Sequence, residues 1–224
     1  AIAGDAWALP SFFKEQADAS TNWDFSYVDL FVEDGIATIT INRPEAMNAL
    51  NEVVVAQLTE AVQVANADSK VSTVVLDGAG KAFVAGADVK FFVDKIRSDD
   101  IPDIETFTAN GHALLAAIED SPKTTIALTT GLALGGGLEL ALACDYRIGT
   151  QRTQFRFPET SIGIYPALGG TQRPARIAGR ELGRWAVLAG NFMNAETATD
   201  LGLVTHLVDI NDVPNCINDI HASG

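Results

Sequence analysis

Three consecutive glycines, Gly135, Gly136 and Gly137, precede an apolar stretch that contains a single acid, Glu139. A glycine inside a helix costs roughly 0.5 to 1 kcal/mol relative to alanine, so helix propensity does not explain this run. Bare backbone at a helix start leaves N–H groups free for a negatively charged oxygen and lets that oxygen approach closely. The run therefore predicts either an oxygen-binding site or, as the alternative, tight packing of a helix on a strand.

Glu139 lies between Leu138 and the apolar residues 140–143, so we expect its helix to be buried on all sides. A buried carboxylate must be paired, hydrogen-bonded or shifted in pKa, and a shifted pKa is typical of acid/base catalysts. The alternative is a structural ion pair with Arg147 or Arg173.

A second glycine-containing segment, formed by Ala85, Gly86, Ala87 and Asp88, follows a predicted strand. It can present another backbone N–H to the same oxygen, and two converging donors form an oxyanion hole. Removal of one such donor typically costs about 2.7 to 4 kcal/mol of transition-state stabilisation. An ordinary turn is the other interpretation of this segment.

A second acid, Glu159, follows Pro158. By itself it is equally well explained as an acid in the first turn of a helix. Together with Glu139 and an oxyanion hole, it suits proton transfer beside a carbonyl group. One acid would then handle the proton of a water molecule and the other the proton on carbon.

Alternating strands and helices must position these residues, which favours a layered α/β domain. The strands at 27–32 and 36–41 are expected to form a hairpin around an Asp-Gly turn. Residues 124–144 carry one charge, but their glycines would interrupt a membrane-spanning helix, so we predict buried core there. The remaining elements are a helix over 49–65 capped by Asn48, strands at 71–76, 125–129 and 146–149, and helices over 104–118, 135–144, 170–177, 180–189 and 195–201.

Composition narrows the class of protein. The chain has 224 residues, of which 47% are hydrophobic, an ordinary fraction for a globular domain. Its net charge of -14 is unfavourable for nucleic-acid binding, because the phosphate backbone is also negative. Cys144 and Cys216 have no neighbouring Cys or His, so neither a metal site nor a disulfide framework is predicted, and a reducing, cytoplasmic setting is expected. No secretory signal opens the chain, and its ends suggest a piece of a longer polypeptide.

Taken together, the motifs resemble those of the crotonase superfamily, the enoyl-CoA hydratase and isomerase group. The resemblance implies a crotonase-like α/β spiral of repeated ββα units, with trimers often paired into hexamers. It divides the chain into a leader or interdomain connector at 1–26, a crotonase core at 27–209 and a truncated C-terminal segment at 210–224. The motifs that carry it are residues 42–44 with 48–50, 81–83 with 85–88, the Gly-Gly-Gly-x-Glu helix, 157–159 and 169–173.

The resemblance also implies a reaction. It assigns the N–H groups of Ala87 and Gly136 to the carbonyl oxygen of a CoA thioester, and it assigns Glu139 and Glu159 to the two acids of hydratases. Dedicated isomerases commonly keep only the later acid, so we expect addition of water to a trans-2-enoyl-CoA, giving a 3-hydroxyacyl-CoA in fatty acid β-oxidation. Coenzyme A would enter as part of the substrate, with no tightly bound cofactor. Further substrate contacts are expected at Lys81, Ala85, Asp88, Val89 and Ala167.

Other interpretations remain open. The same scaffold supports double-bond isomerisation, hydrolysis of a cyclic acyl-CoA and non-catalytic homologues. The leader resembles the connector of bifunctional 3-hydroxyacyl-CoA dehydrogenase/enoyl-CoA hydratases, although the chain has no GxGxxG loop.

Three basic residues after the second glycine segment can receive CoA phosphates or form a solvated basic face: Lys90, Lys95 and Arg97. His112, His206 and His221 lack a spacing suited to a metal or a catalytic triad, and they are expected on a helix face, at a strand end and in the tail.

Overall fold

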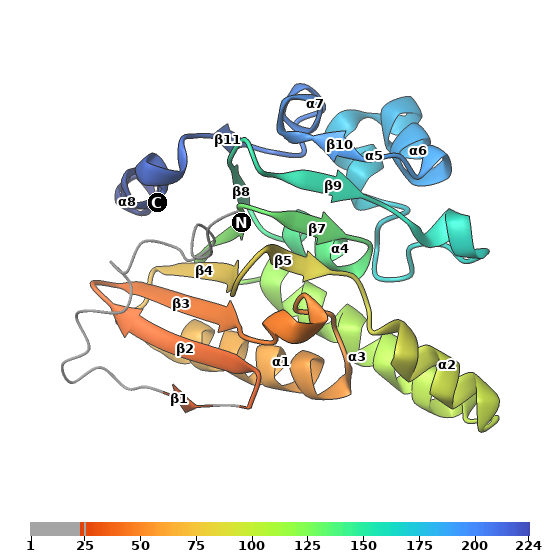
Figure 1. Ribbon diagram of the computed structural model, residues 1–224. Coiled ribbons are helices and arrows are strands. Elements are labelled where there is room, and N and C mark those ends of the chain that lie inside the picture. The colour runs from red at the N-terminus through yellow and green to blue at the C-terminus, as the bar shows by residue number, and fades with distance from the viewer. Residues whose placement is uncertain (1–22, 25) are drawn as a thin grey trace, which may run out of the picture.

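A computed structural model describes residues 23–24 and 26–224 as two stacked sheets with helices around them (Figure 1). Almost all of the expected leader at 1–26 therefore lies outside the described residues. The larger sheet has the strand order β1-β2-β3-β4-β6-β8-β11, and the smaller has the order β10-β9-β7-β5. The described chain is thus a layered α/β structure, as the alternation of predicted elements indicated.

The larger sheet begins with the antiparallel hairpin of β2 (Val28–Glu33) and β3 (Ile36–Ile41), and β1 (Trp23–Asp24) pairs with β2. From β3 onward every pairing is parallel. The parallel strands are β4 (Thr73–Gly78), β6 (Thr124–Thr129), β8 (Tyr146–Gly149) and β11 (His206–Leu207).

The smaller sheet consists of short strands. Its members are β5 (Ala82–Ala85), β7 (Leu132–Leu134), β9 (Gln154–Arg156) and β10 (Met193–Asn194). The pairs β5–β7 and β7–β9 are parallel, and β10 is antiparallel to β9.

A repeat connects the two sheets. The chain passes from β4 to β5, from β6 to β7 and from β8 to β9, and each time the first strand lies in the larger sheet and the second in the smaller one. Helices follow each pair. This is the spiral of ββα units that the resemblance implied. The helices after the three pairs are α2 (Val89–Arg97) with α3 (Ile101–Glu119), α4 (Gly136–Leu142), and α5 (Arg173–Ala178) with α6 (Arg180–Ala189).

The turns between paired strands require glycine. A Cβ on Gly78 would lie 2.2 Å from the carbonyl oxygen of Phe83, and a Cβ on Gly131 would lie 2.2 Å from that of Lys81. Phe83 lies in β5 and Lys81 directly precedes this strand. Because both carbonyl oxygens belong to the backbone, neither clash can be relieved by movement of a side chain. These glycines let each chain segment cross closely from one sheet to the other.

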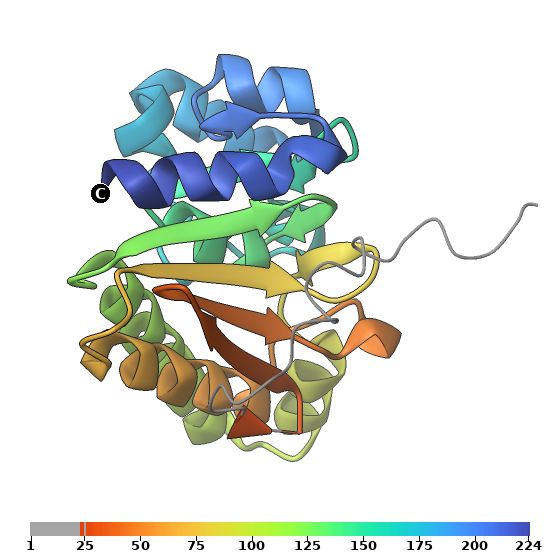
Figure 2. The same ribbon diagram turned by 90° about the vertical axis from the view of Figure 1, so that its left-hand side faces the viewer.

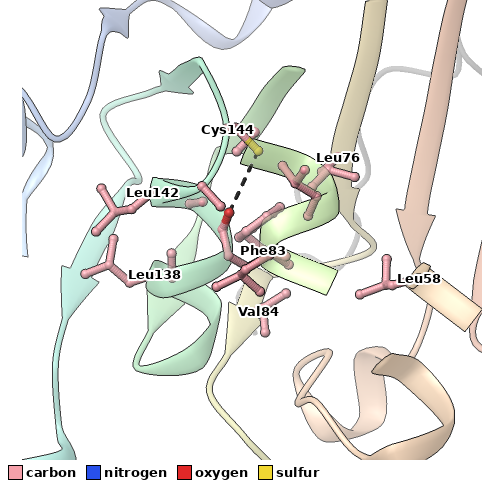
Figure 3. Packing of buried hydrophobic residues seen from close by; sticks show 14 of the residues in the cluster. Leu58, Leu76, Phe83, Val84, Leu138, Leu142 and Cys144 are labelled. Atoms are coloured by element: carbon pink, nitrogen blue, oxygen red, sulfur yellow. Dashed lines mark hydrogen bonds between the residues drawn. The ribbon is translucent and has the colours of Figure 1, made fainter. Parts of the chain in front are cut away.

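The core divides over the two faces of the larger sheet because successive side chains of a strand point to opposite faces. Val74 and Leu76 join the cluster beneath α1 (Glu52–Ala67) and α3, whereas Val75 joins a second cluster with α8 (Val213–Ser223). Figure 2 shows α8, in dark blue, lying across the sheet. Figure 3 shows part of the first cluster, where Phe83 and Val84 of β5 lie close to α4.

Several boundaries differ from the sequence predictions. Asn51, not Asn48, caps α1, because the buried Asn48 has a left-handed backbone (φ 59°) and its side chain bonds to the preceding turn. Helix α5 begins at Arg173 rather than Gly170, since the preceding glycines form a turn that contacts Glu139. The short strands of the smaller sheet and the helices α2 and α8 were not predicted. The remaining short elements are η2 (Pro44–Ala46), η3 (Glu159–Ile162), η4 (Ile210–Asp212) and α7 (Ala195–Asp200).

The apolar stretch at 124–144 forms β6, β7 and α4, as expected for buried core. None of the helices in the described part of the chain is long and apolar enough to cross a bilayer.

Candidate active site

The three glycines before α4 serve three different purposes. Gly135 has φ 47° and ψ -121°, a conformation restricted to glycine, and a Cβ there would lie 2.4 Å from Glu159 Oε1. A Cβ on Gly137 would lie 2.0 Å from the carbonyl oxygen of Val84, so this position does provide tight helix–strand packing. A Cβ on Gly136 would lie 3.4 Å from Leu50 Cδ1 and 3.8 Å from both Ala87 N and Leu168 Cδ1. The middle glycine therefore borders the backbone amide of the second glycine segment.

The amide of Ala87 is left free by the hydrogen bonds around it. Leu50 clamps the segment, because its N–H donates to Gly86 O at 2.9 Å and its carbonyl accepts from Asp88 N at 2.8 Å. Within the residues that the structure describes, no acceptor is paired with the N–H of Ala87 or of Gly136. Two neighbouring, unpaired backbone donors are the composition of an oxyanion hole.

Asn48 holds the backbone that leads into the Ala87 segment. Its Nδ2 donates to Ala79 O at 2.9 Å and to Ala82 O at 2.8 Å, and its Oδ1 accepts from Arg43 N at 2.9 Å. Two residues later in the chain is Leu50, whose backbone bonds to Gly86 and Asp88. The motif at 48–50 thus contributes to the site by fixing backbone.

Glu139 is 2% exposed, and its Oε1 accepts hydrogen bonds from Leu168 N at 2.7 Å and Gly170 N at 2.6 Å. Burial raises the pKa of Glu139 above its ordinary value, while these two hydrogen bonds and the positive charge of Arg173 oppose the rise. Neither suggested ion pair forms: Arg147 donates to backbone carbonyls, including Leu203 O, and Arg173 pairs with Glu119. The partners of Glu139 are main-chain amides instead.

Glu159 is 8% exposed and lies at the start of η3. Its Oε2 is buried with no hydrogen-bond partner among the described residues. Burial, together with the nearby negative charge of Glu139, raises the pKa of Glu159 to about 7, while a backbone hydrogen bond and the positive charge of Arg156 oppose the rise. The protonated form of this side chain is therefore well populated up to about neutral pH, where an ordinary glutamate is ionised.

The two acids lie near each other but in different surroundings. Glu139 has two N–H donors that stabilise its negative charge, whereas Glu159 has an oxygen without any donor. Gly135 contacts both acids: its carbonyl accepts a hydrogen bond from Glu139 N at 2.9 Å, and its Cα, which carries no side chain, lies against the Glu159 carboxylate. Such a pair can hold one proton in a defined place, as proton transfer requires.

The residues expected to contact substrate are exposed or half-buried. Asp88 caps α2 and its Oδ2 lies 2.9 Å from Arg43 Nη1, so its carboxylate is already engaged. Lys81 and Ala167 are exposed, Ala85 is half-buried, and Val89 is 62% exposed. The substrate contacts of these residues stay predictions.

Of the three basic residues after this segment, Lys95 pairs with Asp100 and Asp103, which neutralises its charge locally. Lys90 and Arg97 are exposed on α2.

The three histidines lie on different elements. His112 is exposed on α3 and His206 lies on the edge strand β11, as expected. His221 belongs to helix α8 rather than to an unstructured tail, and its Nδ1 lies 2.8 Å from Thr73 Oγ1.

Two surface hollows, of about 520 and 250 Å³, lie beside α8 and between α1 and α3. Neither is lined by Glu139 or Glu159. The chemistry of the site comes from the buried acids and free amides rather than from these hollows.

The donors that hold Glu139 were not predicted from the sequence. Leu168 and Gly170 act through main-chain N–H groups, which leave no mark in residue type. The signal that was available is the glycine pair at 169–170, since a Cβ on Gly170 would lie 3.0 Å from Glu139 Oε1.

The sequence of the chain is similar to those of known proteins. The family model described as enoyl-CoA hydratase/isomerase matches residues 36–223. A crotonyl-CoA hydratase of Syntrophomonas wolfei is 38% identical over 79% of this chain and 66% of its own length. A short-chain-enoyl-CoA hydratase of Clostridium acetobutylicum is 34% identical over 88% of this chain and 74% of its own. The match thus spans about two-thirds to three-quarters of these relatives.

Solved structures agree with the sequence comparison. An enoyl-CoA hydratase from Bacillus anthracis superimposes with a TM-score of 0.81 at 28% identity, covering 88% of this chain and 76% of that one. DspI of Pseudomonas aeruginosa superimposes with a TM-score of 0.80 at 32% identity, covering 92% and 83%.

Proposed function

The chain belongs to the enoyl-CoA hydratase/isomerase family, and on that basis we propose that it adds water across the 2,3 double bond of a trans-2-enoyl-CoA. One observation carries the proposal: two buried acids in unequal surroundings lie beside two unpaired backbone amides. The names of the relatives support hydration in particular, since those described above include a crotonyl-CoA hydratase and a short-chain-enoyl-CoA hydratase.

In the proposed reaction the thioester oxygen accepts hydrogen bonds from Ala87 N and Gly136 N. These donors stabilise the negative charge that develops on this oxygen as the thioester becomes an enolate. No charged side chain is needed for that task.

The two acids divide the proton transfers. Glu139, whose charge is stabilised by two amides, takes a proton from water while the water oxygen bonds to Cβ. Glu159, which burial keeps protonated below a pKa of about 7, gives its proton to Cα. The product is the 3-hydroxyacyl-CoA, and return of the proton from Glu139 to Glu159 restores the starting state.

The substrate is proposed to contact Lys81, Ala85, Asp88, Val89 and Ala167, and coenzyme A would enter only as part of it. We also propose a cytoplasmic setting, a role in fatty acid β-oxidation, a homotrimeric or hexameric assembly, and fusion to a dehydrogenase domain in a longer chain.

The test is incubation of the protein with crotonyl-CoA while the absorbance of the conjugated enoyl thioester is followed. Loss of absorbance with formation of 3-hydroxybutyryl-CoA is expected. An unchanged signal, together with conversion of a 3-enoyl-CoA to its 2-enoyl isomer, would show an isomerase instead.

A further inference from the structure

Arg173 is a nearly buried cation for which the proposed reaction has no use. It ends the Gly-Gly-Thr-Gln-Arg motif at 169–173 and begins α5, and its side chain is 12% exposed. Its Nη2 donates to Glu119 Oε2 on α3 at 2.7 Å, and its Nη1 donates to Leu168 O at 2.8 Å. Its Nε is buried without an acceptor among the described residues. A buried cation with an unsatisfied donor calls for an explanation.

The carbonyl that Arg173 holds lies between the two amides that bind Glu139. The N–H of Leu168 and the N–H of Gly170 both donate to Glu139 Oε1. The carbonyl of Leu168 belongs to the peptide unit that connects those two donor peptides. The side chain of Arg173 therefore fixes the middle of a three-peptide segment.

The main chain of Arg173 holds the same segment a second time. Its N–H donates to Gly169 O at 2.9 Å, and this carbonyl shares a peptide unit with the N–H of Gly170. Because a peptide unit is planar, a fixed carbonyl also fixes the direction of its N–H. The Gly170 donor is thereby aimed at Glu139.

Gly169 allows this arrangement. A Cβ on Gly169 would lie 2.1 Å from Arg173 Nη1, and its φ is 107°. The guanidinium therefore packs directly against bare backbone, and the position requires glycine for both reasons.

We propose that Arg173 is a positioning residue for Glu139, which acts through the peptide units of residues 168–170 and is itself held in place by Glu119. The positive charge of Arg173 also lowers the pKa of Glu139, against the effect of burial. Only the assignment of Glu139 as base in this inference rests on the proposed function.

The experiment compares Arg173→Lys and Arg173→Met with a control, Arg184→Met. Arg184, on the neighbouring helix α6, is 59% exposed and only 4.0 Å from Glu181, so its loss removes a surface cation of the same kind. Each protein is assayed for kcat and KM with crotonyl-CoA, for thermal unfolding, and for the ionisation of Glu139 by ¹³C NMR without substrate.

Both Arg173 variants are expected to lower kcat by about 10- to 100-fold, the range that a displacement of about 1 Å produces, with little change in KM. In Arg173→Met the titration midpoint of Glu139 should rise. Lysine keeps the charge but cannot bridge Glu119 and Leu168 O as a planar fork does, so its kcat should resemble that of the methionine variant. Arg184→Met should match the wild type.

Wild-type kcat in Arg173→Lys would overturn the proposal, as would an unchanged Glu139 titration in Arg173→Met. Glu119→Gln serves if the Arg173 variants fail to fold: it removes the partner that holds the guanidinium while Arg173 keeps its charge, and it should lower kcat by a smaller factor. If the wild type does not hydrate crotonyl-CoA, the proposed function fails, while the NMR titration of Arg173→Lys, which keeps the charge, still decides the positioning role: a raised Glu139 midpoint supports it and an unchanged one excludes it.

Discussion

Gly135 and Glu159 occupy adjoining space so tightly that a side chain at residue 135 would have to displace the Glu159 carboxylate. The Cβ of an alanine at 135 would lie 2.4 Å from Glu159 Oε1 and 3.2 Å from its carboxyl carbon. The two residues are 24 positions apart, and the strands β8 and β9 lie between them in the sequence. The glycine run before α4 thus positions an acid as well as exposing an amide.

Gly135→Ala should therefore reduce hydration more than it reduces stability. The methyl group must displace the Glu159 carboxylate, and misplacement by about 1 Å can cost about 100-fold in rate. The matched control is Gly179→Ala, because Gly179 also has a positive φ (86°) but has no atom within 4 Å of its Cβ position. Both variants should lose thermal stability through backbone strain, and only Gly135→Ala should lose kcat beyond that. Equal activity losses would contradict this prediction.

Replacement of either acid by its amide should remove most of the activity. Glu139→Gln and Glu159→Gln are each expected to lower hydration of crotonyl-CoA by about 10² to 10⁴-fold, the usual contribution of a general acid or base. Binding of a saturated acyl-CoA, measured by calorimetry, should persist because the backbone amides remain. Turnover that survives either substitution would remove that residue from the mechanism.

The pH dependence of the rate should reflect Glu159. Burial raises the pKa of Glu159 to about 7, so the protonated acid is present below that pH and is lost above it. We expect kcat/KM in the hydration direction to fall as pH rises through about 7. In Glu139→Gln the pKa of Glu159, followed by ¹³C NMR, should decrease because a neighbouring negative charge is gone. A midpoint that stays in place would show that the two side chains do not interact.

A second buried acid, Asp77, should affect stability rather than catalysis. It is 4% exposed on β4, and burial raises its pKa to about 7 against a hydrogen bond from Gly78 N. The folded state thus binds a proton that the unfolded state releases above its ordinary pKa of 3.8, so stability falls as pH rises from about 4 to 7.

Asp77→Asn keeps an acceptor for Gly78 N and carries no charge. Denaturant unfolding should show it more stable than the wild type at pH 8, by on the order of a few kcal/mol, and little different at pH 4. Asp120→Asn, an exposed position at the end of α3, is the control and should change little. The same gain at both pH values would exclude ionisation of Asp77 as the cause.

Local patterns in the sequence were sufficient for the hairpin, the long helices and the burial of α4. The strand at Ile36–Ile41 and the helix at Arg180–Ala189 have the predicted bounds, because alternation and helical spacing record which face of an element is buried. The short strands β5, β7 and β9 were not predicted, since three or four residues carry too little periodicity. They are strands because the ββα repeat places them side by side.

The sequence by itself determined which residue types are available to the site: two acids and two glycine-containing segments, in an order that resembles a known family. Only the tertiary structure decided what each one contacts. Glu139 is bound by amides from residues 168 and 170 rather than by an arginine, and Glu159 has an oxygen without a donor. The reason is physical: the protonation of an acid depends on burial and on nearby donors, and these come from backbone that is distant in sequence and has no signature in residue type.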